Sequence, residues 1–91
     1  MLFMTLYRIL PGKLEEAIDR FGHIGNQIPQ GVELLGRWHD PGSHTGVTIS
    51  QCDDQAALAR FQLQWVDLME LQVRPVLDDK QLAALLAERA Q

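Results

Sequence analysis

The sequence predicts one α+β domain of ferredoxin-like topology, strand-helix-strand-strand-helix-strand, followed by an added C-terminal helix. Three observations predict this fold. The spacing of apolar residues alternates between strand-like and helix-like in that order along the chain. Turn-forming sequences, the strongest being Asp40-Pro41-Gly42-Ser43, separate the segments. The length of 91 residues, 46% of them hydrophobic, suits one small core, so residues 1–91 are expected to form a single domain.

The first half of the chain contains one strand, one helix and a hairpin. Residues 2–10 favour extended backbone and end at a Pro-Gly turn. Apolar residues then recur at helical spacing from residue 13 until the glycines near residue 25. Residues 32–39 and 45–52 are expected to form two strands joined by a long loop.

The second half repeats the pattern of helix and strand. Asp53 or Asp54 is a suitable N-cap for a helix that ends near residues 66–67. Residues 68–76 alternate apolar and polar side chains, which predicts a strand, and Pro75 suits an edge strand. Asp78, followed three residues later by Gln81, predicts a capping box at the start of the last helix.

In this topology both crossover helices cover one face of a four-stranded antiparallel sheet, and the other face stays open. We expect the more apolar alternation set to face the helices: Leu2, Met4, Leu6, Val32, Leu34, Trp38, Val47, Ile49, Met69, Leu71 and Val73. The other set mixes polar residues with Phe3, Tyr7, Ile9 and Leu35. An open face with these apolar residues predicts a homodimer formed through the sheet. A register error of one residue would exchange the two faces of a strand.

Several segments resemble a bacterial family of domains of unknown function. They are Met1-Leu2-Phe3-Met4, the run Gly31-Val32-Glu33-Leu34-Leu35-Gly36-Arg37-Trp38-His39, the segment Trp65-Val66-Asp67-Leu68 and the segment Arg74-Pro75-Val76-Leu77. That family is placed in the dimeric α/β-barrel superfamily. The resemblance implies the ferredoxin-like fold and the dimer, and it brings no established activity. The superfamily includes cofactor-free monooxygenases, isomerases and haem-degrading enzymes, with pockets that tend to lie between the sheet and the helices.

Arg37 and His39 are the first candidates for chemistry. They are two residues apart on a predicted strand, so both point to one face. A guanidinium beside an imidazole can bind a carboxylate or an enolate and move a proton near neutral pH. Tyr7 and Glu70, on the same predicted face, extend the cluster into one suited to proton abstraction next to a carbonyl. An ordinary hydrogen-bonded pair is the simpler alternative.

Three aromatic residues are candidates for the apolar wall of a binding site. Trp38 is expected to face the helices, near Phe61 and Trp65, where two tryptophans could hold a flat ligand by stacking. Packing in an ordinary core is the alternative and the more frequent outcome for such residues.

Composition excludes several classes of function. The net charge is −4 and the eight basic residues are scattered, which argues against nucleic acid and anionic membranes as partners. The three histidines lack metal-ligand spacing and no nucleotide-binding motif occurs, so neither a metal nor a cofactor is predicted. The single cysteine and the lack of a signal-peptide pattern predict a cytoplasmic location.

These observations support three hypotheses about function. The first is a dimeric protein that binds a small molecule in a sheet–helix cleft, with the possibility of a cofactor-independent enzyme of monooxygenase or isomerase type. The second is a non-catalytic dimer that acts as an interaction or sensing module. The third is haem binding, which would require an axial histidine and a wide cleft.

Overall fold

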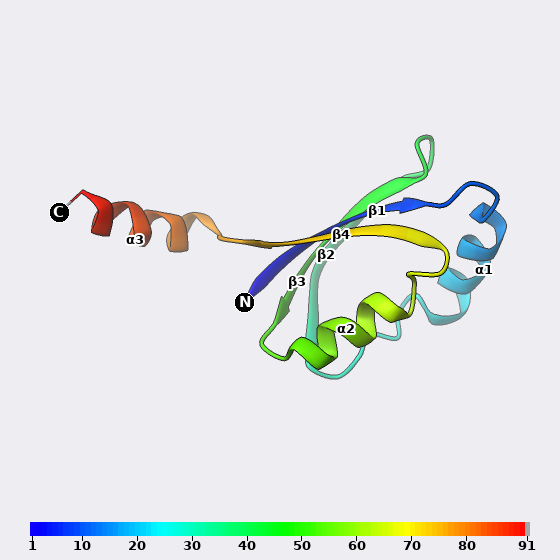
Figure 1. Ribbon diagram of the computed structural model, residues 1–91, viewed down its shortest axis with the longest axis horizontal. Coiled ribbons are helices and arrows are strands. Elements are labelled where there is room, and N and C mark those ends of the chain that lie inside the picture. Colours follow the sequence, from blue (N-terminus) through cyan, green and yellow to red (C-terminus); the bar gives the residue numbers. More distant parts are fainter. Residues whose placement is uncertain (91) are drawn as a thin grey trace.

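The computed structural model describes residues 1–90 and has the predicted order of elements (Figure 1). The four strands form one antiparallel sheet in the order β2-β3-β1-β4, which confirms the ferredoxin-like α+β fold. The elements are β1 (Leu2–Ile9), α1 (Leu14–Ile24), β2 (Val32–Asp40), β3 (Thr45–Cys52), α2 (Gln55–Leu63), β4 (Met69–Val76) and α3 (Asp79–Arg89).

The helices begin where the sequence predicts. Asp54 caps α2 by accepting a hydrogen bond from the Ala56 amide at 2.9 Å. Asp78 and Gln81 form both halves of the capping box of α3. Helix α2 ends at Leu63, a few residues earlier than expected, because the chain makes a turn in which the Trp65 carbonyl accepts from the amides of residues 68 and 69.

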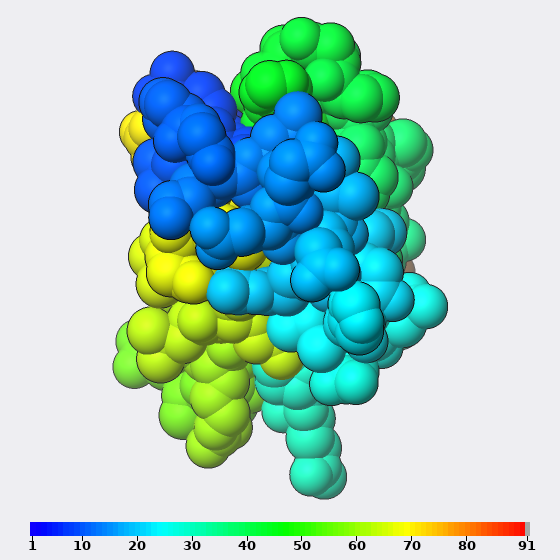
Figure 2. All heavy atoms as spheres, turned by 90° about the vertical axis from the view of Figure 1, so that its right-hand side faces the viewer, coloured from blue at the N-terminus to red at the C-terminus, as the bar shows by residue number. Residues whose placement is uncertain are grey.

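The helices α1 and α2 lie on one side of the sheet, whereas α3 projects from the opposite end of the molecule (Figure 1). Figure 2 looks at the end formed by α1, which lies between the β2–β3 turn and α2. Strand β4 is an edge strand, as Pro75 predicts. Among residues 1–90, no helix combines the length and the apolar composition needed to cross a bilayer.

A β-bulge in β2 changes which residues of this strand face the helices. Leu34 lies opposite Ser50, but Gly36 lies opposite Ile49, so Leu35 is an extra residue in β2. The bulge shifts the alternation of side chains by one residue. As a result Arg37 and the residues that follow it point to the opposite side from the one that regular alternation predicts.

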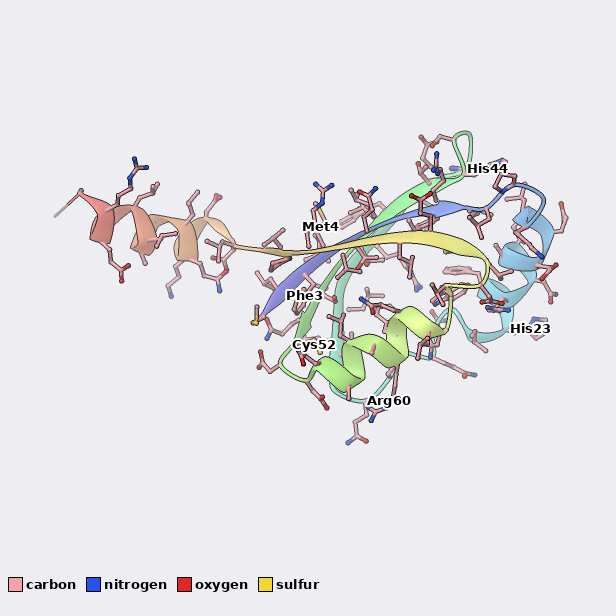
Figure 3. All side chains as sticks on the ribbon, viewed as in Figure 1. Phe3, Met4, His23, His44, Cys52 and Arg60 are labelled. Atoms are coloured by element: carbon pink, nitrogen blue, oxygen red, sulfur yellow. The ribbon has the colours of Figure 1, made fainter. Side chains whose placement is uncertain are left out.

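The predicted assignment of faces is wrong for β1, for β3 and for the second half of β2. Phe3 points toward α2 and Met4 points away from it (Figure 3). Thr5, Tyr7 and Ile9 accordingly line the space under the helices. The assignment is correct for β4: Met69 and Leu71 are predicted to face the helices, and both line the space under the helices. The error arises because polar residues line a cavity under the helices, so the more polar set lies inside.

The open face of the sheet has an apolar centre. Its side chains lie opposite one another in the antiparallel register, with Trp38, Val47 and Leu6 in one row and Ile49 and Met4 in the next. Polar residues border it on two neighbouring strands: Arg8 at the end of β1, and Glu70, Gln72 and Arg74 along β4. Four apolar residues are predicted for this face. Phe3 (Figure 3), Tyr7 and Ile9 lie on the helix-covered side instead, and only Leu35 lies outside it.

Helix α3 makes little contact with the rest of the chain. Every described residue of this helix is exposed. Leu82, Leu85 and Leu86 form an apolar stripe, and each keeps about half of its surface accessible. An isolated helix of 11 residues is marginally stable in water, so α3 depends on packing against a partner. Its apolar stripe has no such partner among residues 1–90.

Candidate functional site

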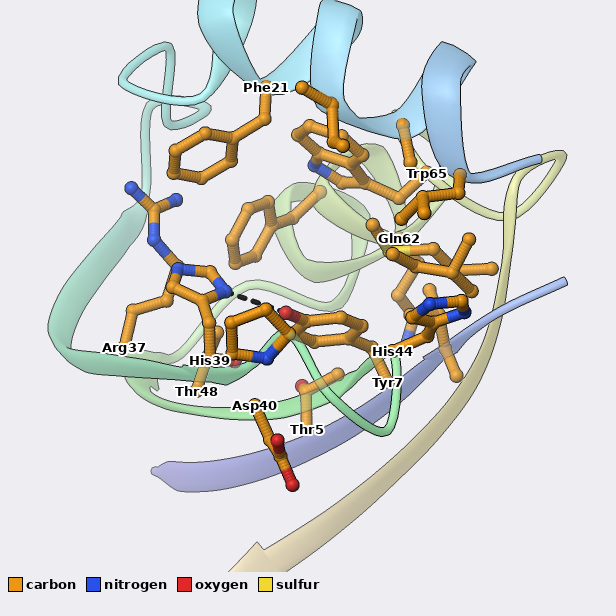
Figure 4. A pocket seen from close by; sticks show the side chains of 18 of the residues that line it. Thr5, Tyr7, Phe21, Arg37, His39, Asp40, His44, Thr48, Gln62 and Trp65 are labelled. Atoms are coloured by element: carbon orange, nitrogen blue, oxygen red, sulfur yellow. Dashed lines mark hydrogen bonds between the residues drawn. The ribbon is translucent and has the colours of Figure 1, made fainter.

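A pocket of about 340 Å³ lies between the sheet and the helices α1 and α2 (Figure 4). Its volume falls at the small end of the range for small-molecule sites. All four strands contribute to its floor, and apolar side chains of both helices form its roof. The pocket therefore occupies the place where a ferredoxin-like domain would otherwise have a tightly packed core.

The roof is held in place by polar contacts between segments that are distant in sequence. Arg20 of α1 donates to both carboxylate oxygens of Asp67, at 2.6 and 2.9 Å, and to the carbonyl oxygen of Gln64 at 2.9 Å. These contacts anchor α1 to the turn after α2. Because α1 buries only Ala17 fully, it roofs the pocket without filling it.

Aromatic side chains form the apolar wall. Trp65 is buried, and its ring lies 6.4 Å from that of Phe21 across the roof. Phe61 and Leu58 of α2 line the same space, as their helical spacing predicts. A wall of flat rings of this kind suits a flat, apolar ligand.

The first row of the floor runs across three strands. Arg37 of β2 lies opposite Thr48 of β3, which lies opposite Thr5 of β1. Arg37 donates from Nη1 to the carbonyl oxygen of Gly25 at 2.8 Å, and its guanidinium carbon lies 4.6 Å from the centre of the Phe21 ring. The backbone contact and the cation–π contact fix the guanidinium at the pocket wall.

The second row brings a tyrosine and a histidine together. Tyr7 Oη and His39 Nδ1 are 2.6 Å apart, a hydrogen bond that joins β1 to β2 across β3 (Figure 4). The residue between them in the register is Gly46. An added Cβ at Gly46 would lie 2.5 Å from Tyr7 Cζ, so glycine leaves the space through which the tyrosine ring reaches the histidine.

Burial and local charge keep both partners of this hydrogen bond neutral near pH 7. Burial, followed by the positive charge of Arg37, lowers the pKa of His39 below its ordinary value. Burial raises the pKa of Tyr7, Arg37 opposes that rise, and Asp40 adds to it. With both groups neutral, the Tyr7 hydroxyl donates to His39 Nδ1 when the imidazole is the Nε2–H tautomer, and Nδ1 donates to Tyr7 Oη in the other tautomer.

Comparison with protein-family models gives a match over residues 1–90 to the domain of unknown function DUF3303. The chain belongs to the DUF3303 family. This confirms the resemblance to a family of domains of unknown function, and it assigns no activity. None of the curated proteins compared with this DUF3303 domain matches it.

Solved structures similar to the DUF3303 domain are themselves distant in sequence. An uncharacterised NIPSNAP domain protein from Burkholderia xenovorans is 22% identical with a TM-score of 0.49, covering 87% of this chain and 97% of that one. The protein SCO4226 from Streptomyces coelicolor A3(2) is 20% identical with a TM-score of 0.47, covering 86% and 100%. The protein Atu4242 from Agrobacterium tumefaciens is 17% identical with a TM-score of 0.48, covering 87% and 96%.

The DUF3303 domain brings together five of the seven candidate residues named from its sequence. Tyr7, Arg37 and His39 lie on the floor of the pocket, and Phe61 and Trp65 lie in its apolar wall. Their roles stay predictions, but their clustering around one cavity is what the hypothesis of a sheet–helix site requires.

The other two candidates lie on the open face, away from the pocket. Trp38 is 59% exposed and lies over Gly36, so its predicted position under the helices is wrong; the bulge at Leu35 turns it to the opposite side. Glu70 forms an ion pair with Arg8 at 2.6 Å and does not join the cluster. Adjacent residues of a strand point to opposite faces, and on β4 it is Leu71 that faces the pocket, so Glu70 points to the open face.

Sequence reasoning missed three residues that shape the site. Phe21 is one apolar residue among several at helical spacing, and Thr48 is one polar residue among several in its strand, so neither stands out in the sequence. Gly46 does carry a signal in the sequence, since a glycine inside a strand rich in β-branched residues often marks close approach of another group.

Stability is expected to fall on acidification because of His39. Its lowered pKa means that the unfolded chain takes up a proton there before the folded domain does, so this contribution to folding is present above the ordinary histidine pKa and is lost as the pH falls through the lowered value. Urea unfolding at about pH 8 and about pH 5 measures this effect. The free energy of unfolding should fall less between the two pH values in the variant His39→Gln than in the unaltered protein.

The measurement at about pH 8 is the control for this prediction, because His39 is neutral there in both states and any difference reports the lost Tyr7 contact. An equal loss of stability on acidification in the variant and in the unaltered protein would contradict it.

Proposed function

We propose that this DUF3303 domain is a homodimeric protein that binds a small, flat and largely apolar molecule in the pocket between its sheet and its helices. The observation that carries the proposal is the pocket itself: about 340 Å³ lined by aromatic and aliphatic side chains, with polar groups gathered on one side. Convergent polar groups in an apolar cavity are typical of small-molecule sites.

The two tryptophans of the chain allow a direct test of binding. Trp65 lines the pocket and Trp38 lies on the other face of the sheet, so the variants Trp38→Phe and Trp65→Phe each keep one reporter. Titration with nitrobenzene, a flat and uncharged probe, should change the emission of Trp65 in a saturable manner in the Trp38→Phe variant.

The Trp65→Phe variant is the matched control, because its remaining tryptophan is remote from the pocket. Its emission should show no saturable change, and circular dichroism should confirm that both variants are folded. A Trp65 signal that responds only linearly to the probe would overturn the proposal. Titration with haemin addresses the haem alternative, since axial ligation by histidine changes the haem absorption spectrum.

The dimer part of the proposal rests on the open face of the sheet. Leu2, Met4, Leu6, Val47 and Ile49 lie together there without cover from residues 1–90, beside the exposed Trp38. An apolar centre bordered by polar residues is the usual composition of an interface. A two-fold axis would cover the face with an identical copy, and each copy would offer the unpartnered leucines of α3 as further contact surface.

We also propose a cytoplasmic location. Cys52 is a buried free thiol whose Sγ donates to the carbonyl oxygen of Asp54 at 3.0 Å. A free cysteine supports this location because reducing compartments keep thiols unpaired.

A further inference from the structure

The floor of the pocket carries a positive charge that forms no ion pair within the described chain. Arg37 has no carboxylate partner within 4.0 Å among residues 1–90. Its only hydrogen bond there goes to the carbonyl oxygen of Gly25, although a guanidinium has five N–H donors. A half-buried cation with free donors beside an apolar cavity favours an anionic group on the ligand.

A second polar group in the floor also lacks a partner. Thr48, which lies opposite Arg37 in the register and lines the pocket, is 7% exposed, and its hydroxyl makes no hydrogen bond with the rest of the described chain. A buried hydroxyl without a partner is costly, and a ligand oxygen at this place would satisfy it.

The Tyr7–His39 pair supplies a proton acceptor next to these donors. Both members are neutral near pH 7, and the phenol oxygen of Tyr7 faces the pocket while bonded to His39 Nδ1 at 2.6 Å. The other titratable groups of the lining are Arg37, Asp40 and His44; α1 and α2 add only apolar side chains and Gln62. The helices therefore contribute no charge that would stabilise a cationic ligand.

We propose that the ligand carries an acidic hydroxyl of the phenol or enol class, and that the pocket ionises it; this inference rests on the proposed function. His39 is the Nε2–H tautomer at the start, so that Nδ1 accepts from the Tyr7 hydroxyl. The O–H bond of the ligand breaks and its proton passes to Tyr7 Oη, while the proton of Tyr7 passes to His39 Nδ1 and leaves an imidazolium. The resulting oxyanion is held by Arg37 and by the Thr48 hydroxyl. The step moves two protons and no electrons, so it requires no oxidant and no further reactant.

A carboxylic acid fits these groups less well. It is already ionised near pH 7, so it has no use for a proton acceptor.

The test uses 4-nitrophenol as the probe, because its ionised form absorbs at longer wavelength than its neutral form. An opposite charge at close range lowers a pKa by one unit or more, so the bound probe should show a phenolate-to-phenol ratio at least about tenfold higher than the free probe at the same pH. Arg37→Met should abolish this increase, Arg37→Lys should restore part of it, and Tyr7→Phe should reduce it.

Two further probes separate this inference from the proposed function. If neither nitrobenzene nor 4-nitrophenol binds, the proposed function itself fails. If nitrobenzene binds and bound 4-nitrophenol ionises no more than the free probe, the pocket stands and the inference is overturned. Tighter binding of 4-nitrobenzoate than of 4-nitrophenol would also overturn it, in favour of the carboxylate class.

Discussion

Replacement of Ile49 by glutamate is expected to dissociate the proposed dimer. Ile49 lies near the middle of the open face, next to Met4 and Gly36 in the register, with no basic residue directly opposite. Two-fold symmetry would bury two unpaired carboxylates, at a cost of at least about 4 kcal/mol, which raises the dissociation constant about a thousandfold.

Sedimentation equilibrium at micromolar concentration is the appropriate measurement. The unaltered protein should run at about twice 10.3 kDa and the Ile49→Glu variant at 10.3 kDa. Because Ile49 and the pocket lie on opposite faces, the emission of Trp65 should be unchanged in the variant.

The matched control is Gln72→Glu, which adds the same charge at the polar border of the same face. Gln72 already accepts a hydrogen bond from Arg74 at 3.1 Å, so a carboxylate there keeps a partner and the dimer should persist. A mass of 10.3 kDa for the unaltered protein itself at this concentration would end the dimer proposal.

The second large effect is expected from Gly46→Ala. The added Cβ would lie 2.5 Å from Tyr7 Cζ and 2.6 Å from the carbonyl oxygen of Trp38, both closer than van der Waals contact allows. The tyrosine ring must move, the Tyr7–His39 hydrogen bond is lost, and overpacking of this kind costs about 1–3 kcal/mol. Urea unfolding gives the stability, and the change in 4-nitrophenol ionisation should disappear together with the hydrogen bond.

The chain offers a glycine that should respond in the opposite direction. Gly22 lies within α1, and a Cβ added there would meet nothing within 4 Å. Gly22→Ala is therefore expected to stabilise the domain by about 0.5–1 kcal/mol, since glycine is unfavourable inside a helix. If Gly46→Ala were as well tolerated as Gly22→Ala, the steric account of the Tyr7–His39 pair would be wrong.

The periodicity of the sequence predicted the elements but not the faces of the sheet. The strand at residues 45–52 and the caps at Asp54 and Asp78 agree with the structure, because alternation and capping depend on neighbours in the chain. The faces of β1 and β3 were exchanged, since the prediction assumed that the more apolar set packs against the helices. That assumption fails where the helices roof a cavity lined by Thr5 and Thr48.

Candidate residues show the same division. The spacing of Arg37 and His39 placed them on one face of a strand, an inference that needs only local geometry. Trp65 lies beyond the end of α2 at Leu63, so its place in the pocket wall beside Phe61 follows from the turn after the helix and not from helical spacing. The bulge at Leu35 depends on pairing with β3, which no local pattern encodes, and it turned Trp38 out of the site.

The sequence by itself therefore determined the order of elements, the topology and the residue types available for chemistry, because these follow from local periodicity and composition. Only the tertiary structure decided that Tyr7 crosses Gly46 to reach His39, that Arg37 lies against Phe21 without a carboxylate partner in the described chain, and that the apolar face points outward. The physical reason is that a sheet is assembled by register between distant segments, and a shift of one residue in that register moves a side chain from one face to the other.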